Sequence, residues 1–231
     1  MKIYLKDIKH YFLTVDTNSI RKHHMREEFK EYDLTEVNPI LNICKNKSGA
    51  TGFSKMLDIG LRNQNRALPF QPFVMYEDDC SKYREFPEYI EVPDNADLLY
   101  IGLSRCSMNN ISDHSANYYT HITPEIIRIY NMLAMHGIIV CSASGALAIQ
   151  KAVLEGYTKN IIWDIFVAYI QPYYNVYALK NPLVFQHGKY GGSEPETKFS
   201  ITSQNDCILP NEYINTTNES IITCQTDTKH Y

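Results

Sequence analysis

The run Pro72-Phe-Val-Met-Tyr76 is followed without a break by three acidic residues, Glu77, Asp78 and Asp79. An uninterrupted apolar run of this length is typical of a strand that is buried on both faces, as in a parallel sheet covered by helices. In open α/β sheets, ligands bind at the carboxyl ends of the strands. The acidic triplet therefore stands where this kind of fold has its binding site.

On both sides of this run, strand-like and helix-like segments alternate along the sequence. Compact apolar runs predict strands at residues 10–16, 34–41, 97–103, 138–141, 175–178 and 182–187. Helices are expected at residues 20–32, 48–64 and 146–155, the last with Gly156 as its stop, and in a stretch led by Trp163. Residues 109–121 are polar and predict a long loop. This order predicts an α/β, Rossmann-like fold with a mostly parallel sheet flanked by helices.

The length and composition are those of one globular domain with a polar end. A chain of 231 residues can bury a substantial core, and we assign residues 1–199 to a single domain. From residue 200 to 231 the sequence is rich in Thr, Asn, Ser and Gln and poor in large apolar residues. This composition predicts a tail that is weakly ordered or forms an edge arm.

Charge and targeting features argue against several classes of protein. A formal net charge of -4 disfavours nucleic acid as a partner, because such binding needs a basic face. No apolar run is long enough to span a bilayer, and the first residues lack the apolar stretch of a signal peptide. The six cysteines show no CxxC spacing, which disfavours zinc. We therefore expect a cytoplasmic protein with reduced thiols and no transmembrane segment.

The acidic triplet has a chemical explanation. Ionised neighbours repel one another, and each raises the pKa of the others unless a cation lies among them. Mn²⁺ and Mg²⁺ prefer oxygen ligands and share their coordination shell with substrate phosphates. Glu77, Asp78 and Asp79 are thus predicted to form a metal–diphosphate site. The alternative is that acidic residues simply end a strand at the protein surface, and the triplet alone leaves both interpretations open.

The segment Phe73-Val-Met-Tyr-Glu-Asp-Asp-Cys80 resembles the strand and acidic motif of GT-A fold glycosyltransferases. It is most similar to glycosyltransferase family 25 and related enzymes of large DNA viruses. Residues 11–18 with Arg21, residues 49–54 and residues 141–151 follow in the family's order, so the resemblance covers roughly residues 8–190. It implies a GT-A-like fold, a nucleotide-sugar donor with UDP as the expected nucleotide, and a glycan or glycoprotein acceptor. For a viral protein, the location would be the host cytoplasm.

The resemblance also implies roles for individual residues. Asp79 would bind the metal directly, and Glu77 or Asp78 would hold the donor ribose or a metal-bound water. His187 ends the predicted strand at 182–187 and would be a further metal ligand, although a histidine that simply faces water is an equal alternative. The expected metal ligands are therefore Asp78, Asp79 and His187.

Donor-binding residues are expected on two further segments. Thr14, Val15 and Asp16 at the end of the first strand, together with Arg21, would line the base and ribose pocket. An ordinary surface salt bridge is the alternative for Arg21. Where family 25 has Ser-His, this chain has Ser54-Lys55, so the lysine is predicted to meet a donor phosphate instead.

Asp164 is the candidate catalytic base, which would accept a proton from the acceptor hydroxyl in an inverting transfer. The alternative is that Asp164 caps the following helix. Trp163 could stack on a sugar ring or pack in the core. The turn at Ser142–Gly145 could admit the acceptor or simply cap a helix, and residues 112–115 could form a lid.

Other transferases and hydrolases fit the motifs less well. A nucleotidyl or phosphoryl transferase would also carry acidic residues at strand ends, but the phosphate loop GxxxxGK[ST] is missing from the sequence. Ala143-Ser144-Gly145 lacks the first glycine of the G-x-S-x-G hydrolase elbow. A non-catalytic or degenerate nucleotide-sugar-binding module is the non-enzyme alternative. The leading prediction is a metal-dependent glycosyltransferase.

Overall fold

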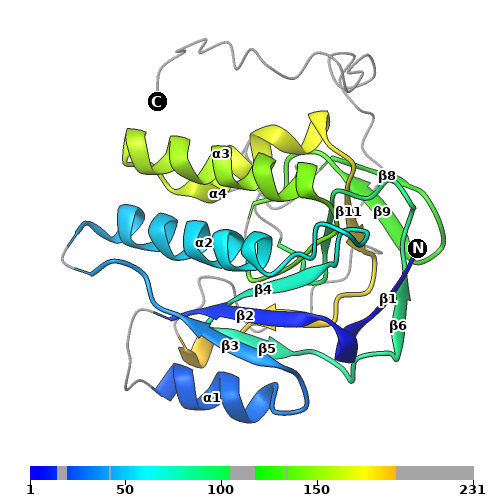
Figure 1. The fold of residues 1–231 in the computed structure, drawn as a ribbon, viewed down its shortest axis with the longest axis horizontal. Helices are drawn as coiled ribbons and strands as arrows, with labels where there is room; N and C mark the ends of the chain where they lie inside the picture. Colours follow the sequence, from blue (N-terminus) through cyan, green and yellow to red (C-terminus); the bar gives the residue numbers. More distant parts are fainter. Residues whose placement is uncertain (15–19, 42, 105–117, 134, 191–231) are drawn as a thin grey trace.

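The structure, a computed structural model, describes residues 1–14, 20–41, 43–104, 118–133 and 135–190. Within these residues the largest feature is an eight-stranded sheet with helices on both faces (Figure 1). In spatial order its strands are β3 (Leu34–Val37), β2 (Lys9–Leu13), β4 (Phe73–Glu77), β10 (Gly137–Val140), β7 (Leu98–Tyr100), β11 (Val176–Leu179), β9 (Ile126–Ile129) and β8 (Tyr119–His121).

Strand direction agrees with the predicted fold class. The strand pairings make β3, β2, β4, β7, β11 and β8 run one way, whereas β10 and β9 run the other way. The α/β, Rossmann-like architecture with a mostly parallel sheet is therefore confirmed.

Helices cover the two faces of the sheet unequally. Helix α1 (Ile20–Glu28) lies on one face, whereas α2 (Lys45–Arg62), α3 (Ala143–Lys159) and α4 (Trp163–Ile170) lie on the other (Figure 1). None of the described helices has the length and apolar character needed to cross a membrane.

Strand β4 contributes to both hydrophobic cores. Phe73 and Met75 belong to the core under α2, α3 and α4, whereas Val74 and Tyr76 belong to the core under α1. Side chains alternate across a strand, so a strand covered on both faces needs apolar residues at every position. This explains the unbroken run before Glu77.

Several short elements surround this framework. The strands β1 (Lys2–Tyr4) and β6 (Tyr89–Glu91) form one antiparallel pair, and β5 (Cys80–Lys82) and β12 (Val184–Gln186) form another. Single turns of 3₁₀ helix occur at η1 (Leu5–Asp7), η2 (Gln171–Tyr173) and η3 (Gly188–Tyr190). The pair β5–β12 matters most for the site, because it continues directly from the acidic triplet.

Some predicted boundaries are wrong. The helix expected over 20–32 ends at Glu28, and the helix expected from residue 48 begins at Lys45. Part of the loop expected over 109–121 is strand β8, while residues 109–117 lie outside the described residues. The predicted boundary between the 1–199 domain and the 200–231 tail also lies outside them.

Gly156 does not stop its helix. Helix α3 continues to Lys159 and ends at Asn160, which has a left-handed φ of 57°. A Cβ at Gly156 would lie 2.8 Å from the backbone Cα of Trp163, where α4 begins. Glycine is thus used here for the close approach of two helices and not for a helix end.

Candidate functional site

The acidic triplet lies at the carboxyl ends of the parallel strands β2 and β4. The register of these strands pairs Leu13 with Glu77, so Thr14 and Asp78 follow at the same edge of the sheet. Thr14 is fully buried, and its backbone N–H donates to the carbonyl oxygen of Val37, the last residue of β3. The ends of three neighbouring strands therefore meet at this edge. The predicted donor-binding residues Val15 and Asp16 lie outside the described residues.

The carboxylates of the triplet are buried and incompletely hydrogen-bonded. Asp78 and Asp79 are only 6% and 7% exposed. Arg21 Nη1 donates to Asp78 Oδ1 at 2.8 Å, and Gln186 Nε2 donates to Glu77 Oε2 at 2.8 Å. Asp78 Oδ2 and Asp79 Oδ1 are buried and have no hydrogen-bond partner among the described residues. A buried carboxylate oxygen without a partner is costly, so this arrangement favours a ligand that supplies positive charge.

Burial and mutual repulsion both act on these groups. Burial raises the pKa of Asp79 to about 6; Arg21 opposes this rise and Asp78 adds to it. Burial also raises the pKa of Glu77 well above its ordinary value, with further increases from Asp79, Asp164 and Asp78. Arg21 is therefore not enough to neutralise the negative charge at this edge of the sheet.

The predicted base, Asp164, is brought towards the triplet by the fold. Helix α4 begins at Trp163 with Ile162 as its N-cap, so Asp164 is the second residue of the helix and not its cap. Its charge is close enough to raise the pKa of Glu77. Packing of α4 against α3 and α2 thus brings Asp164 towards Glu77, although the two residues are far apart in the sequence.

His187 lies beside Asp79 because β12 pairs with β5. The backbone N–H of His187 donates to the carbonyl oxygen of Asp79 at 2.8 Å. Its ring Nδ1 accepts from the backbone N–H of Lys189 at 3.2 Å, and the ring packs against Tyr190. The location fits the predicted role in metal binding, which itself stays a prediction.

The triplet offers the oxygen donors that a hard divalent cation prefers, including two without other partners. No complete set of three His, Cys, Asp or Glu side chains arranged to hold a metal occurs in the described parts of the chain. Mg²⁺ is commonly held by one or two carboxylates, with substrate phosphates and water completing the shell. The residues present therefore fit a divalent cation that binds together with a phosphate-bearing substrate.

Lys55 and Ser54 lie on α2. Lys55 is exposed, and its Nζ donates to the backbone carbonyl of Asn38 at 2.9 Å, just beyond the end of β3. Ser54 is partly exposed on the same helix. The contact with Asn38 keeps Lys55 near the carboxyl end of β3. Its contact with a donor phosphate stays a prediction.

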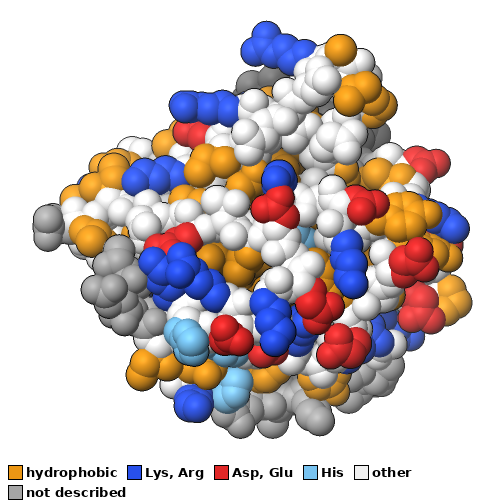
Figure 2. Space-filling view, turned by 60° about the horizontal axis from the view of Figure 1, so that its bottom comes forward, with side chains coloured by type: hydrophobic (Ala, Val, Ile, Leu, Met, Phe, Trp, Pro, Cys, Tyr) orange, Lys and Arg blue, Asp and Glu red, His pale blue; other side chains and the backbone are white. Residues whose placement is uncertain are grey.

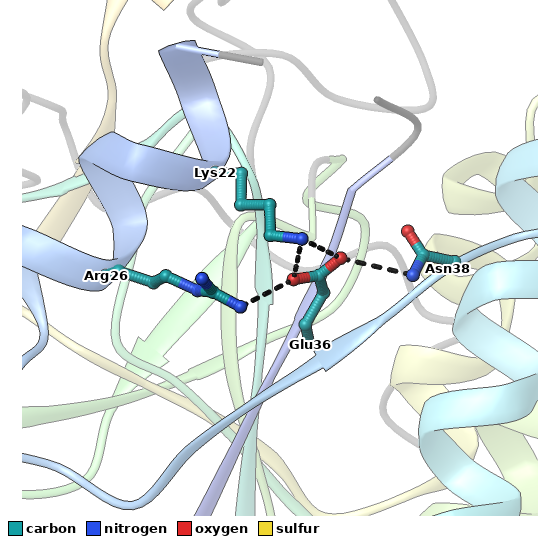
Figure 3. A network of polar contacts seen from close by, with 4 residues as sticks. All are labelled: Lys22, Arg26, Glu36 and Asn38. Atoms are coloured by element: carbon teal, nitrogen blue, oxygen red, sulfur yellow. Dashed lines mark hydrogen bonds and ion pairs between the residues drawn. The ribbon is translucent and has the colours of Figure 1, made fainter. Parts of the chain in front are cut away.

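The other two cationic side chains of α1, Lys22 and Arg26, form ion pairs elsewhere. Lys22 and Arg26 both pair with Glu36 on β3, at 2.6 and 3.2 Å, and Asn38 donates to the same carboxylate (Figure 3). Acidic and basic side chains are interspersed on the face that carries α1 (Figure 2). The basic start of α1 therefore fastens the helix to the sheet edge, and Arg21 is the member that reaches the triplet.

The fold decides between the alternatives that the sequence left open for the turn after β10. Because β10 runs antiparallel to β4, the turn after it lies at the opposite edge of the sheet. There Ser142 Oγ accepts from the N–H of Gly145 and donates to Asp97 Oδ1, which makes it the N-cap of α3. Of the two alternatives for this turn, the structure shows the helix cap.

Trp163 belongs to the helical layer. Its ring lies where a Cβ of Gly49 would be, and it packs against Phe53 with ring centroids 5.4 Å apart. Of the two alternatives for Trp163, the structure shows packing against the core. The lid predicted at residues 112–115 lies outside the described residues.

Gln186 is a site residue that the sequence did not reveal. Its amide is held over Glu77 because β12 aligns Gln186 with Cys80, directly after the triplet. Its position directly before His187, a predicted metal ligand, could have pointed to it in the sequence. An open pocket of about 300 Å³ lies nearby, between α1 and residues 82–85, but none of the predicted site residues lines it.

Comparisons with known proteins add little to this description. No family model matches the chain, and no curated protein matches its sequence. Among solved structures, the chain is similar to the CTP:phosphocholine cytidylyltransferase of Streptococcus pneumoniae, with 10% sequence identity and a TM-score of 0.40. The match covers 78% of this chain and 92% of that one. A likeness of this degree carries no argument about activity.

Proposed function

We propose that the chain is a metal-dependent transferase that acts on a nucleotide substrate and binds its phosphates at the acidic triplet. The observation that carries the proposal is the pair of buried carboxylate oxygens without partners, Asp78 Oδ2 and Asp79 Oδ1. They lie at the carboxyl ends of parallel strands, where α/β proteins bind their ligands. A purely structural acidic turn would leave no reason to bury these oxygens unpaired.

In this proposal the carboxylates of Asp79 and Asp78 hold Mn²⁺ or Mg²⁺ together with the substrate phosphates, and His187 would join them as the ion binds, because the three side chains are not already arranged as a metal site. A bound cation supplies positive charge opposite the substrate phosphates and offsets the charge that develops on the leaving group. Glu77 stays hydrogen-bonded to Gln186 and faces the ribose. Arg21 orients the carboxylate of Asp78 through their hydrogen bond.

The nucleoside would lie over the end of β2, at Thr14, Val15 and Asp16. Ser54 and Lys55 would approach the phosphates from α2, on the side of β3. These assignments follow the resemblance in the sequence and the shared edge of β2, β3 and β4.

The specific reaction that we propose is glycosyl transfer from a nucleotide sugar, with UDP as the expected nucleotide, to a hydroxyl of a glycan or protein. The acceptor oxygen attacks the anomeric carbon as the bond from that carbon to the diphosphate breaks. Asp164 accepts the hydroxyl proton, which makes the reaction a single inverting displacement without an enzyme nucleophile. Its position near Glu77 supports this role.

Nucleotidyl transfer is the second candidate. The observation that carries the proposal, unpaired carboxylate oxygens suited to a cation and phosphates, serves this reaction equally well. The two reactions break different bonds. Glycosyl transfer releases a nucleoside diphosphate, whereas nucleotidyl transfer from a nucleoside triphosphate releases pyrophosphate.

The test is product analysis with Mn²⁺ present. UDP-sugars and pairs of nucleoside triphosphate with phosphorylated acceptor are incubated with the wild type, with Asp79→Asn, and with Asp33→Asn as a control at an exposed carboxylate. We expect release of UDP or of pyrophosphate that Asp79→Asn abolishes and Asp33→Asn retains. Equal product release by the wild type and Asp79→Asn would remove the metal role, and a lack of either product from the wild type would leave a non-catalytic module.

A further inference from the structure

His136 is a buried histidine at the same edge of the sheet as the acidic triplet. It directly precedes β10, whose first residue, Gly137, pairs with Tyr76, the neighbour of Glu77. On the other side of β10 lies β7, and the His136 ring packs against Gly102, just beyond the end of that strand. The side chain is thus located between the ends of β4 and β7, beside the proposed nucleotide site.

The imidazole of His136 is unsatisfied. The residue is 2% exposed, and neither ring nitrogen has a hydrogen-bond partner within the described residues. His10 shows the usual arrangement for a buried histidine in the same chain. Its Nδ1 lies 3.0 Å from the hydroxyl of Tyr76, and its Nε2 lies 2.8 Å from the carbonyl oxygen of Leu5. Buried polar groups are normally paired in this way, so His136 needs a different explanation.

Packing does not supply that explanation. A Cβ at Gly102 would lie 2.2 Å from His136 Nε2, so the ring fits only because position 102 is a glycine. An aliphatic side chain at position 136 would fill this space without the cost of burying two unpaired nitrogens. The described residues around position 136 therefore do not explain why it is a polar ring.

The chemistry of the ring indicates what it would bind. Burial lowers the pKa of His136 to about 4, so the ring is neutral at pH 7 and offers one N–H donor and one acceptor nitrogen. A hydroxyl group both donates and accepts, and therefore matches a neutral imidazole. A phosphate only accepts and favours cationic partners. A hydroxyl-bearing ring is the better match.

We infer that His136 contacts a hydroxyl of the substrate, on the transferred sugar or on the ribose, an inference that rests on the proposed function. The hydroxyl would pair with the two ring nitrogens, which have no hydrogen-bond partner among the described residues. His136 is thus a binding residue retained for the substrate.

The experiment compares His136→Leu, His136→Gln and, as a matched control, His10→Leu. The melting temperature is measured without ligand, and the Kd values for UDP, UDP-glucose and CTP are measured by calorimetry with Mn²⁺. We expect His136→Leu to raise the melting temperature by about 2–4 °C and to weaken probe binding about fivefold or more. His136→Gln keeps a donor and an acceptor and should restore part of the affinity. His10→Leu leaves the Tyr76 hydroxyl and the Leu5 carbonyl oxygen without their hydrogen-bond partner and should lower the melting temperature.

The probes distinguish the two hydroxyl sources. A loss confined to UDP-glucose identifies the sugar, whereas a loss shared with UDP or CTP identifies the ribose. If His136→Leu lowers the melting temperature as His10→Leu does, or leaves the affinity of bound probes unchanged, the inference is overturned while the proposed function stands. Weakened binding that depends on neither Mn²⁺ nor Asp79 would support His136 and overturn the proposed function. A wild type that binds none of the probes would overturn both.

Discussion

Asp78 and Asp79 are neighbours in the chain, but the fold gives their carboxylates different surroundings. Asp78 accepts a hydrogen bond from Arg21, which keeps a cation beside one of its oxygens. Burial raises the pKa of Asp79 to about 6, against an ordinary value of 3.8. The carboxylate of Asp78 is therefore fixed by Arg21, whereas the carboxylate of Asp79 depends more on a bound cation.

At the residue scale, we predict that Asp79→Asn stabilises the ligand-free protein at pH 7. The pKa of Asp79 is higher in the folded protein than in the unfolded chain, so protonation of Asp79 stabilises the folded state. This stabilisation is complete below about pH 3.8 and is lost as the pH rises through about 6. A shift of this size corresponds to roughly 2–3 kcal/mol. The unfolding free energy of Asp79→Asn should exceed that of the wild type by this amount at pH 7.

The difference should shrink as the pH is lowered towards 4, which denaturant titrations across this range would measure. Asp33→Asn is the control, because Asp33 is an exposed carboxylate paired with Lys9. A difference between Asp79→Asn and the wild type that does not change with pH would contradict the prediction.

At the scale of elements, the direction of β10 decides which loops can reach the site. A strand in the parallel direction would have brought the turn at Ser142–Gly145 to the edge that carries Glu77. The antiparallel strand instead sends that turn to the opposite edge and brings His136 to the site. The contact between α3 and α4 then determines where Asp164 lies.

Gly156→Ala tests this helix contact. Glycine-to-alanine changes inside an exposed helix usually stabilise by about 1 kcal/mol. At position 156 the added Cβ would lie 2.8 Å from the backbone of Trp163, so α4 must move. We predict a lower melting temperature and reduced turnover, because Asp164 is the second residue of α4.

Thr158→Ala, at an exposed position of the same helix, is the control and should leave both quantities close to the wild type. A Gly156→Ala variant that is more stable than the wild type would show that helix propensity outweighs the contact with α4.

At the scale of the whole molecule, the site joins parts of the chain from both layers around the sheet. Arg21 comes from α1 on one face and Asp164 from α4 on the other, and both act on the triplet at the end of β4. A ligand bound here contacts elements that the fold otherwise holds separately. Ligand binding should therefore stabilise the domain as a unit.

We predict that a bound nucleotide with Mn²⁺ raises the melting temperature. At a ligand concentration of about 100 Kd the stabilisation is roughly 2.7 kcal/mol, which corresponds to about 5–10 °C for a domain of this size. Thermal-shift measurements with nucleotide alone, Mn²⁺ alone and both together would check it. The shift should need both components and be absent in Asp79→Asn. An equal shift without Mn²⁺ would contradict a metal-dependent site.

Much of the framework was predictable because its strands and helices have patterns that are visible in the local sequence. The run before Glu77 is buried on both faces, and Ile138–Val140 likewise forms a buried strand. Strand β9 was missed, and the extent of α1 was overestimated. Gly156 was predicted to stop α3 because its contact with Trp163 of α4 is a packing contact between two helices, which the local helix signals do not reveal.

The site was predictable only in part. The position of Glu77, Asp78 and Asp79 at a strand end followed from the apolar run before them. Gln186 and His136 reach this edge through the pairing of β12 with β5 and of β10 with β4. Such pairings join residues far apart in sequence and depend on strand direction, which no local pattern encodes.

By itself, the sequence determined the alternation of strands and helices and the acidic triplet at the end of β4, because periodicity and burial follow from side chains close together in the chain. Only the tertiary structure decided the reversal of β10, the role of Ser142 as a helix cap, and the approach of Asp164 to Glu77. These features depend on which strands pair and which helix faces touch, and packing energy across the whole domain selects both.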